Sequence, residues 1–174
     1  MPERQNKREQ FQSKTSNRKK WFFPGLLLVL VVSVVTGSWL LLAQPSLSHK
    51  TVTAEQDGTL RFVASDLDDG KARFYRYQGK TAPVDFFLVR SQDGVIRAAF
   101  DTCDVCYRER KGYRQEGNDM VCNNCDQHFR TDLVNVVKGG CNPAPLQRQQ
   151  IGETIVITAS DIERGAGYFK TAVN

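Results

Sequence analysis

Hydrophobic and polar positions divide the chain into four stretches of different character. Residues 1–20 are polar and basic, with too few apolar side chains to fold alone. Residues 21–43 form an uncharged apolar run that is long enough to cross a bilayer as a helix. Residues 44–55 are polar and contain proline, serine and threonine, so we expect a linker. Residues 56–174 show the alternating pattern of a small folded domain.

Short apolar runs between turn signals predict β-strands in this domain. The run Val84–Arg90 is apolar on both faces, which is typical of a central strand covered on two sides. The turn Ser91–Gly94 and a return strand, Val95–Phe100, would form a hairpin that leads directly into the first cysteine. Further strands are expected at 59–64, 71–78 and 154–158, and Ser160 is expected to cap a short helical turn. The pattern therefore predicts a mainly β fold, with a small α+β fold as the alternative.

The apolar run at 21–43 has the features of an uncleaved membrane anchor. Aromatic side chains stand near both of its ends, as they do at membrane interfaces. A signal peptide would have a shorter apolar region and a small-x-small cleavage site, whereas this run ends in Leu41-Leu42-Ala43. The basic flank predicts that residues 1–20 lie in the cytoplasm as a tail. The domain would then lie outside the cytoplasmic (inner) membrane, in the periplasm of a two-membrane bacterium.

The distribution of charge argues against nucleic-acid binding. Residues 1–20 carry seven Lys or Arg and two Glu, which account for the whole formal charge of +5. The rest of the chain has equal numbers of basic and acidic residues. The domain therefore lacks the basic surface that a nucleic acid would require.

The candidate chemistry of the chain lies in its five cysteines, all within residues 101–146. They are Cys103, Cys106, Cys122, Cys125 and Cys141. The first four form two C-x-x-C pairs separated by 15 residues, and 15 more precede the fifth. Two residues between thiolates allow a tight turn to direct both sulfurs at one metal ion, and two such turns give tetrahedral coordination. Glycines beside the fifth cysteine would let the backbone approach a sulfur cluster closely.

Several chemistries fit this spacing. A structural zinc ribbon needs four thiolates and would leave Cys141 over, unless Cys141 replaces one of them. A single iron ion or an iron–sulfur cluster also accepts four thiolates. Without a metal, the pairs would close into disulfides in an oxidising compartment. We expect His128 on the surface and His49 in the linker, rather than as metal ligands. No general acid, base or nucleophile group appears, so we expect an electron carrier or a metal-binding protein rather than an enzyme.

Four stretches around the cysteines resemble one known family. They are residues 72–77, 95–106, 111–117 together with 120–125, and 138–143. The chain resembles the FtrD-like membrane iron–sulfur proteins over about residues 55–174. The resemblance implies a membrane-tethered, ferredoxin-like protein of bacterial iron uptake. Its implied partners are an iron permease and a periplasmic iron- or copper-binding protein. Some members have several membrane spans, whereas one is predicted here, which favours a redox or metal-binding module over a permease.

The sequence therefore predicts a membrane-anchored iron–sulfur protein that transfers one electron in an iron-uptake system. The alternative is a structural or metal-delivery module that binds zinc, iron or copper through the same cysteines and docks to a transporter. A thiol–disulfide protein is a third hypothesis. Redox activity would separate the first two, because zinc has no accessible redox couple.

Overall fold

The computed structural model describes residues 49–170. The predicted cytoplasmic tail and membrane-spanning run lie outside these residues. Among residues 49–170, no helix is both long enough and apolar enough to cross a membrane.

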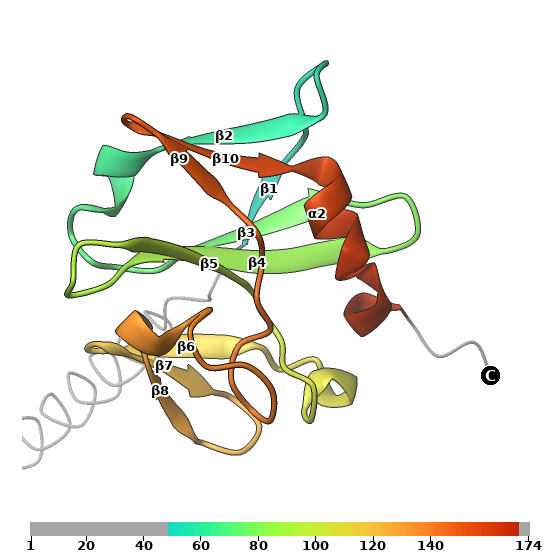
Figure 1. Cartoon of the computed structure of the whole chain (residues 1–174). Helices are drawn as coiled ribbons and strands as arrows, with labels where there is room; N and C mark the ends of the chain where they lie inside the picture. The colour runs from blue at the N-terminus through green and yellow to red at the C-terminus, as the bar shows by residue number, and fades with distance from the viewer. Residues whose placement is uncertain (1–48, 171–174) are drawn as a thin grey trace, which may run out of the picture. The chain divides into compact units, whose positions relative to one another are not determined.

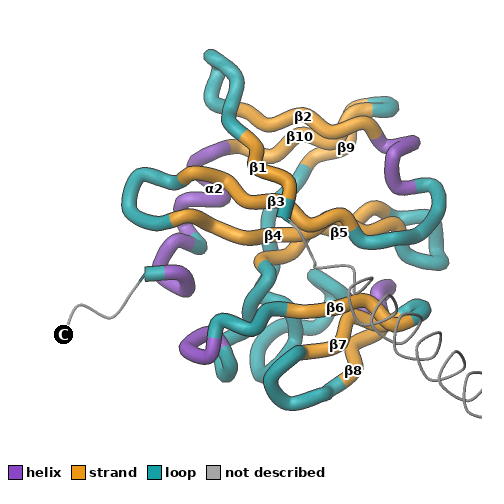
Figure 2. Tube along the Cα trace, turned by 180° about the vertical axis from the view of Figure 1, so that it is seen from behind, coloured by secondary structure: helices purple, strands orange, loops and turns teal. Residues whose placement is uncertain are grey.

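The described part of the chain is mainly β, as the sequence predicts, and its strands form three sheets (Figures 1 and 2). The central sheet has four strands, in the order β1 (Lys50–Val52), β3 (Arg73–Gln78), β4 (Pro83–Arg90) and β5 (Ile96–Phe100). The second sheet contains β2 (Thr59–Val63), β10 (Thr154–Thr158) and β9 (Gln149–Ile151). The third contains β6 (Tyr113–Glu116), β7 (Asp119–Cys122) and β8 (His128–Arg130). One short α-helix is described, α2 (Ala159–Arg164), and the 3₁₀ turns are η2 (Ala64–Leu67), η3 (Tyr107–Glu109), η4 (Thr131–Leu133) and η5 (Ala166–Phe169).

Strand β4 separates two hydrophobic cores, because its side chains alternate between the two faces of the central sheet. Phe86 and Leu88 pack into the first core, with apolar side chains from β2, β10 and α2. Phe87 and Val89 pack into the second core, which we call the cysteine core because it contains Cys103 and Cys122. Strand β4 pairs with β3 on one side and β5 on the other, so the predicted central strand is confirmed.

The cysteine core lies between the central sheet and the lobe that carries β6, β7 and β8, drawn below the central sheet in Figure 1. The chain enters this lobe at the end of β5, where all five residues of the strand are buried. After the lobe, the chain runs back beside β5 at residues 144–146. The amide of Ala144 donates to the carbonyl of Thr102, and the amide of Phe100 donates to the carbonyl of Ala144. This return brings Cys141 back beside Cys106, although the two are 35 positions apart in the sequence.

Two elements of secondary structure differ from the sequence prediction. Residues 50–52 were expected to belong to a linker, but they form β1, which pairs in parallel with Tyr75–Tyr77 of β3. The cap of α2 is Thr158 rather than Ser160, because the Thr158 hydroxyl accepts the amide N–H of Asp161 at 3.1 Å. Strand β1 begins where the chain pairs with β3. Helix α2 begins where β10 ends, at Thr158.

Candidate metal centre

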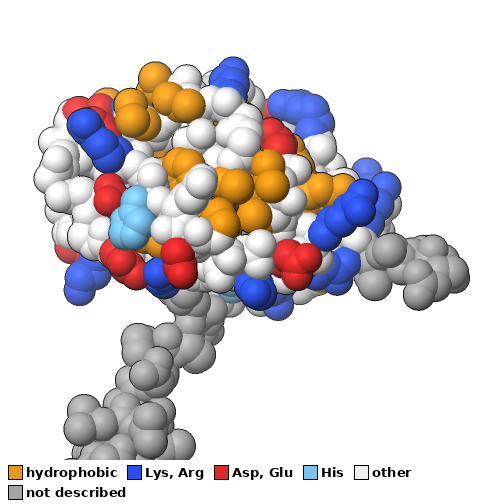
Figure 3. Space-filling view, turned by 90° about the horizontal axis from the view of Figure 1, so that it is seen from below, with side chains coloured by type: hydrophobic (Ala, Val, Ile, Leu, Met, Phe, Trp, Pro, Cys, Tyr) orange, Lys and Arg blue, Asp and Glu red, His pale blue; other side chains and the backbone are white. Residues whose placement is uncertain are grey.

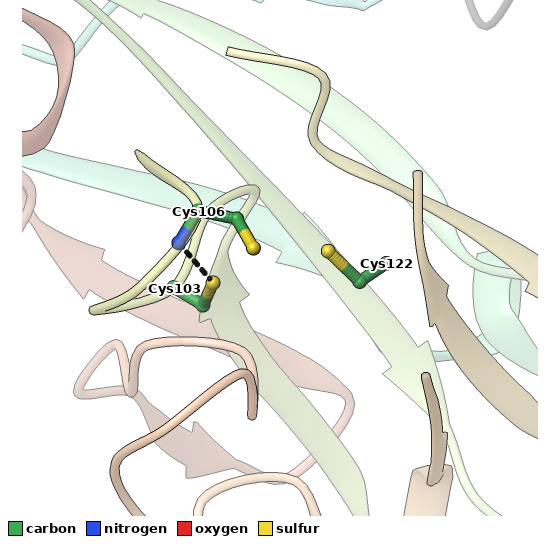
Figure 4. Close-up of side chains that lie close together, drawn as sticks. All are labelled: Cys103, Cys106 and Cys122. Atoms are coloured by element: carbon green, nitrogen blue, oxygen red, sulfur yellow. Dashed lines mark hydrogen bonds between the residues drawn. The ribbon is translucent and has the colours of Figure 1, made fainter. Parts of the chain in front are cut away.

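The first cysteine pair forms a tight turn immediately after β5. The amide N–H of Cys106 donates to the sulfur of Cys103 at 3.1 Å (Figure 4). Cys103 is buried in the cysteine core, whereas Cys106 is partly exposed. The turn therefore directs two sulfurs toward the interior of the lobe and supplies an N–H group that stabilises a thiolate.

The second pair forms a similar turn between β7 and β8. Cys122 ends β7, and its carbonyl accepts the amide of Asp126, which has a left-handed backbone with φ of 54°. Burial raises the pKa of the Cys122 thiol to about 11, although the backbone amides of Asn124 and Cys125 act to lower it. The amide of Gln127 lowers the pKa of the Cys125 thiol. An N–H donor to a sulfur is thus present in the first turn, and backbone N–H groups favour the thiolates in the second.

The fifth cysteine follows two glycines with a left-handed backbone, a conformation that favours glycine. Gly139 and Gly140 have φ of 84° and 64°, in the left-handed region. The carbonyl of Cys141 accepts the hydroxyl of Tyr113 at 2.6 Å, which holds the cysteine against the lobe. Desolvation is the main cause of a raised pKa at the Cys141 thiol.

All five predicted cysteines meet in one place. The sulfurs of Cys103, Cys106 and Cys122 lie within 4.8 Å of one another, and so do those of Cys106, Cys125 and Cys141. Figure 4 shows the sulfurs of the first group pointing toward one another. The sulfurs of Cys106 and Cys141 are 3.8 Å apart. This separation is close to the edge of a tetrahedron with metal–sulfur bonds of about 2.3 Å. An all-sulfur donor set fits iron, zinc, Cu(I) and iron–sulfur clusters.

A family model described as "Membrane iron-sulfur containing protein FtrD-like" matches residues 67–169, which is more than half of the chain. The chain belongs to the FtrD-like family of membrane iron–sulfur proteins. The resemblance noted in the sequence is therefore confirmed, and the match includes all five cysteines of the metal centre. No curated protein matches this FtrD-like chain.

Solved structures share only a distant likeness with this FtrD-like chain. One is the quaternary ammonium Rieske monooxygenase CntA in complex with the inhibitor MMV12, at 16% identity and a TM-score of 0.38, covering 57% of this chain and 30% of that one. Another is CntA in complex with its substrate gamma-butyrobetaine, at 17% identity and a TM-score of 0.36, covering 56% of this chain and 30% of that one. The FtrD-like chain thus spans less than a third of these enzymes. TM-scores this low support no inference about its function.

The metal centre of the FtrD-like domain has a buried side and an exposed side. Cys103 and Cys122 are 1% and 2% exposed, whereas Cys125 is exposed. The face seen from below in Figure 3 carries a patch of hydrophobic side chains among charged ones. In the part of the chain that contains the cysteines, the exposed apolar side chains are Val105, Leu133, Val136 and Val137. The centre is therefore shielded by the core on one side and reaches the protein surface at Cys125.

Tyr113 is a residue of the centre that the sequence did not single out as a site residue. Its ring is 1% exposed and packs near Phe87 and Phe129. Burial raises the pKa of its hydroxyl, and the neighbouring Cys103 raises this pKa further. The only signal in the sequence was its closeness to the cysteines. Its position follows from the pairing of β6 with β7, which places Tyr113 opposite Cys122.

The two histidines of the chain differ in their surroundings: His128 lies on the surface, and His49 contacts a buried carboxylate. His128 is exposed and lies 3.3 Å from Asp119, outside both groups of sulfurs, so its predicted surface position is confirmed. His49 was expected to be solvated in the linker, which is wrong. Its Nε2 lies 2.9 Å from the carboxylate of Asp101, and this contact raises the pKa of His49. Asp101 is buried beside the first cysteine pair and needs hydrogen-bond partners, which His49 and the amide of Tyr113 supply.

Proposed function

We propose that this FtrD-like protein is a membrane-anchored electron-transfer component of a bacterial iron-uptake system, with an iron–sulfur cluster held by the five cysteines. The convergence of Cys103, Cys106, Cys122, Cys125 and Cys141 is the observation that carries the proposal. Membership of a membrane iron–sulfur family supports it. A cluster of this kind accepts and releases an electron without a general acid or base.

The protein residues around the cysteines suit such a role. The amide N–H groups in both turns stabilise thiolates and tune the potential of a bound cluster. The buried side, formed by the cysteine core, excludes water. The exposed side at Cys125 leaves a short path for an electron to reach a partner protein. We therefore propose an electron carrier rather than an enzyme.

We further propose that residues 21–43 anchor the protein in the cytoplasmic membrane. Residues 1–20 would remain in the cytoplasm, and the domain from residue 56 onward would lie in the periplasm. The proposed partners are an iron permease and a periplasmic iron- or copper-binding protein. A fusion of alkaline phosphatase to residue 174 should be active if the domain is periplasmic, and an inactive fusion would contradict this orientation.

The test of the cofactor is a joint measurement of metal, acid-labile sulfide and visible absorption on the full-length protein purified without oxygen. Iron, sulfide and charge-transfer absorption that bleaches on reduction are expected. The exposed His128→Ala variant should keep all three and serves as a control. Stoichiometric zinc without colour, from cells supplied with iron, would overturn the electron-transfer proposal.

A second candidate function, metal delivery, is favoured by one observation. Cys125 is exposed and the pKa of its thiol is lowered, as suits a ligand that exchanges metal with a partner. A delivery protein would pass zinc, iron or copper to a chelator within minutes and would show no reversible redox change. Metal retained through repeated reduction and oxidation would favour electron transfer.

A further inference from the structure

We propose that a cavity beside the first cysteine pair binds a small organic dicarboxylate, with the side chains of Arg110 and Lys111 as its cationic contacts. The cavity encloses about 320 Å³ between the central sheet and the segment that follows Cys106. This volume falls within the usual range of ligand pockets, about 300–1,000 Å³. The inference goes beyond the proposed electron transfer and does not depend on which metal the cysteines hold.

The charges around the cavity favour an anion. Its lining carries three Arg or Lys side chains and two carboxylates. Arg76 and Asp85 cancel each other, because the guanidinium donates to both carboxylate oxygens at 2.6 and 2.7 Å. Asp101 is 7% exposed and is already bound by His49 and by the amide of Tyr113. The lining therefore keeps at least one net positive charge, even with Asp101 ionised and His49 neutral.

The two remaining cations have no acidic partner among the described residues. Arg110 and Lys111 are both exposed, and no carboxylate within residues 49–170 forms an ion pair with either. The Arg110 guanidinium donates to the carbonyl of Lys170 at 2.7 Å, which leaves its charge uncompensated. Charge-assisted hydrogen bonds from Arg and Lys to carboxylates are strong. Two adjacent cations at one cavity thus match the two carboxylates of one ligand.

The backbone holds these cations at the cavity. Arg110 and Gly112 have a left-handed backbone, with φ of 53° and 63°. A side chain at position 112 would collide with Asp101, because an added Cβ would lie 2.5 Å from its carboxylate. The amide and the side chain of Asn123 donate to the carbonyls of Gly112 and Lys111 at 3.0 and 2.8 Å. The cationic segment is therefore fixed both against a buried carboxylate and to the second cysteine turn.

Apolar walls favour an organic ligand over an inorganic anion. Pro83, Tyr107 and Phe169 also line the cavity. Their carbon surfaces can cover the carbon chain of a dicarboxylate, as the apolar walls of ligand pockets commonly do. Phosphate has no carbon surface to bury and would gain only the contacts to the cations.

The cavity lies next to the metal centre. It shares Lys111 and Gly112 with a smaller space in the lobe. That smaller space is also lined by Cys103, Cys106 and Cys122. A dicarboxylate in the cavity would therefore be separated from the cysteine sulfurs by one layer of chain.

The experiment is isothermal titration calorimetry of succinate into the full-length protein, purified in detergent without oxygen, at low ionic strength. Saturable binding of one succinate per chain is expected. Arg110→Gln and Lys111→Gln should each weaken binding about tenfold, because each removes a charge-assisted hydrogen bond, whereas Lys111→Arg should keep it. Arg108→Gln is the matched control, since Arg108 is an exposed cation of the same segment that does not line the cavity. No saturable binding, or an equal loss in Arg108→Gln, would overturn the proposal.

Two further measurements use only the wild-type protein and remain valid if a variant misfolds. Inorganic phosphate should bind more weakly than succinate, and equal or tighter binding of phosphate would overturn the dicarboxylate assignment. Saturating succinate should protect Lys111 from acetic anhydride, as measured by peptide mapping, without changing the labelling of the exposed Lys138. Equal labelling of Lys111 with and without succinate would overturn the site. These results are separable from the proposed function, because a redox-silent zinc protein would still bind succinate.

Discussion

The five cysteine sulfurs have different electrostatic environments, although the residue type is the same. Burial raises the pKa of Cys122 to about 11, whereas the amide of Gln127 lowers that of the exposed Cys125. At the residue scale, the position of each cysteine between core and surface decides how readily its thiolate forms and how easily a reagent reaches it.

Cys125 is expected to be the most reactive cysteine of the metal-free protein. A thiol with a lowered pKa becomes a thiolate at a lower pH, so alkylation of Cys125 should rise with pH before that of the other cysteines. Peptide mapping after brief treatment with iodoacetamide at several pH values checks this. Cys141, which is partly exposed but has a raised pKa, is the comparison, and faster alkylation of Cys141 would contradict the prediction.

Tyr113→Phe is expected to change both the stability and the redox potential. The variant keeps the buried ring but removes the hydroxyl that donates to the Cys141 carbonyl, which should cost about 1–2 kcal/mol in the free energy of unfolding. Loss of this hydrogen bond should also change the midpoint potential of a bound cluster, because the hydroxyl holds the backbone of the ligand Cys141 in place. Urea denaturation and redox titration measure the two effects.

Tyr107→Phe is the matched control for this substitution. Tyr107 follows the first cysteine pair directly, but its hydroxyl accepts a hydrogen bond from Arg108 and makes none with a cysteine. Its removal should leave the potential unchanged. Equal potentials in wild type and Tyr113→Phe would show that the Tyr113 hydroxyl is only structural.

At the scale of elements, β4 connects the metal centre to the rest of the domain. Its alternating side chains belong to different cores, with Phe86 in the first core and Phe87 in the cysteine core. Both rings have 0% exposure. Neighbouring residues of one strand therefore act on opposite sides of the central sheet, and only one of them lies next to the metal centre.

Phe86→Leu and Phe87→Leu form a matched pair that tests this division. Each should lower the free energy of unfolding by about 1 kcal/mol, because a similar apolar volume is kept in a buried site. Only Phe87→Leu should alter the visible spectrum or metal retention, since only Phe87 packs with Tyr113 and the buried cysteines. A spectral change of the same size in Phe86→Leu would contradict the separation of the two cores.

At the scale of the whole described domain, the two cores differ in what stabilises them. The first core is covered by the β2–β10–β9 sheet, α2 and η5. The cysteine core is covered by a lobe with three short strands, and two of its buried residues are Cys103 and Cys122. A bound metal would therefore contribute a large share of the stability of the lobe and a small share of that of the first core.

Removal of the metal is expected to destabilise the lobe selectively. After chelation under reducing conditions, amide hydrogen exchange should accelerate by at least about tenfold in residues 103–142, because metal binding and folding of such sites are coupled. Exchange in β2 and β10 should change much less. Hydrogen exchange measured by mass spectrometry, with and without metal, checks this. Uniform acceleration across both cores would show that the domain unfolds as one unit.

Much of this arrangement is determined by the sequence alone. The two-sided apolar run predicts that β4 is central, since only a strand covered on both faces can bury alternate side chains in two directions. The C-x-x-C spacing predicts the tight turns that direct paired sulfurs at a metal, because these depend on residues only a few positions apart. The cysteine pattern also identified the family that the chain belongs to.

Contacts between distant segments were decided only by the tertiary structure. Pairing of residues 144–146 with β5 brings Cys141 to Cys106, and pairing of β6 with β7 brings Tyr113 into the centre. His49 became part of the fold because a buried carboxylate, 52 positions away, needed a partner. Local spacing is fixed by the length of the chain between two residues. Such long-range contacts are fixed by the packing of whole sheets, which one sequence does not reveal.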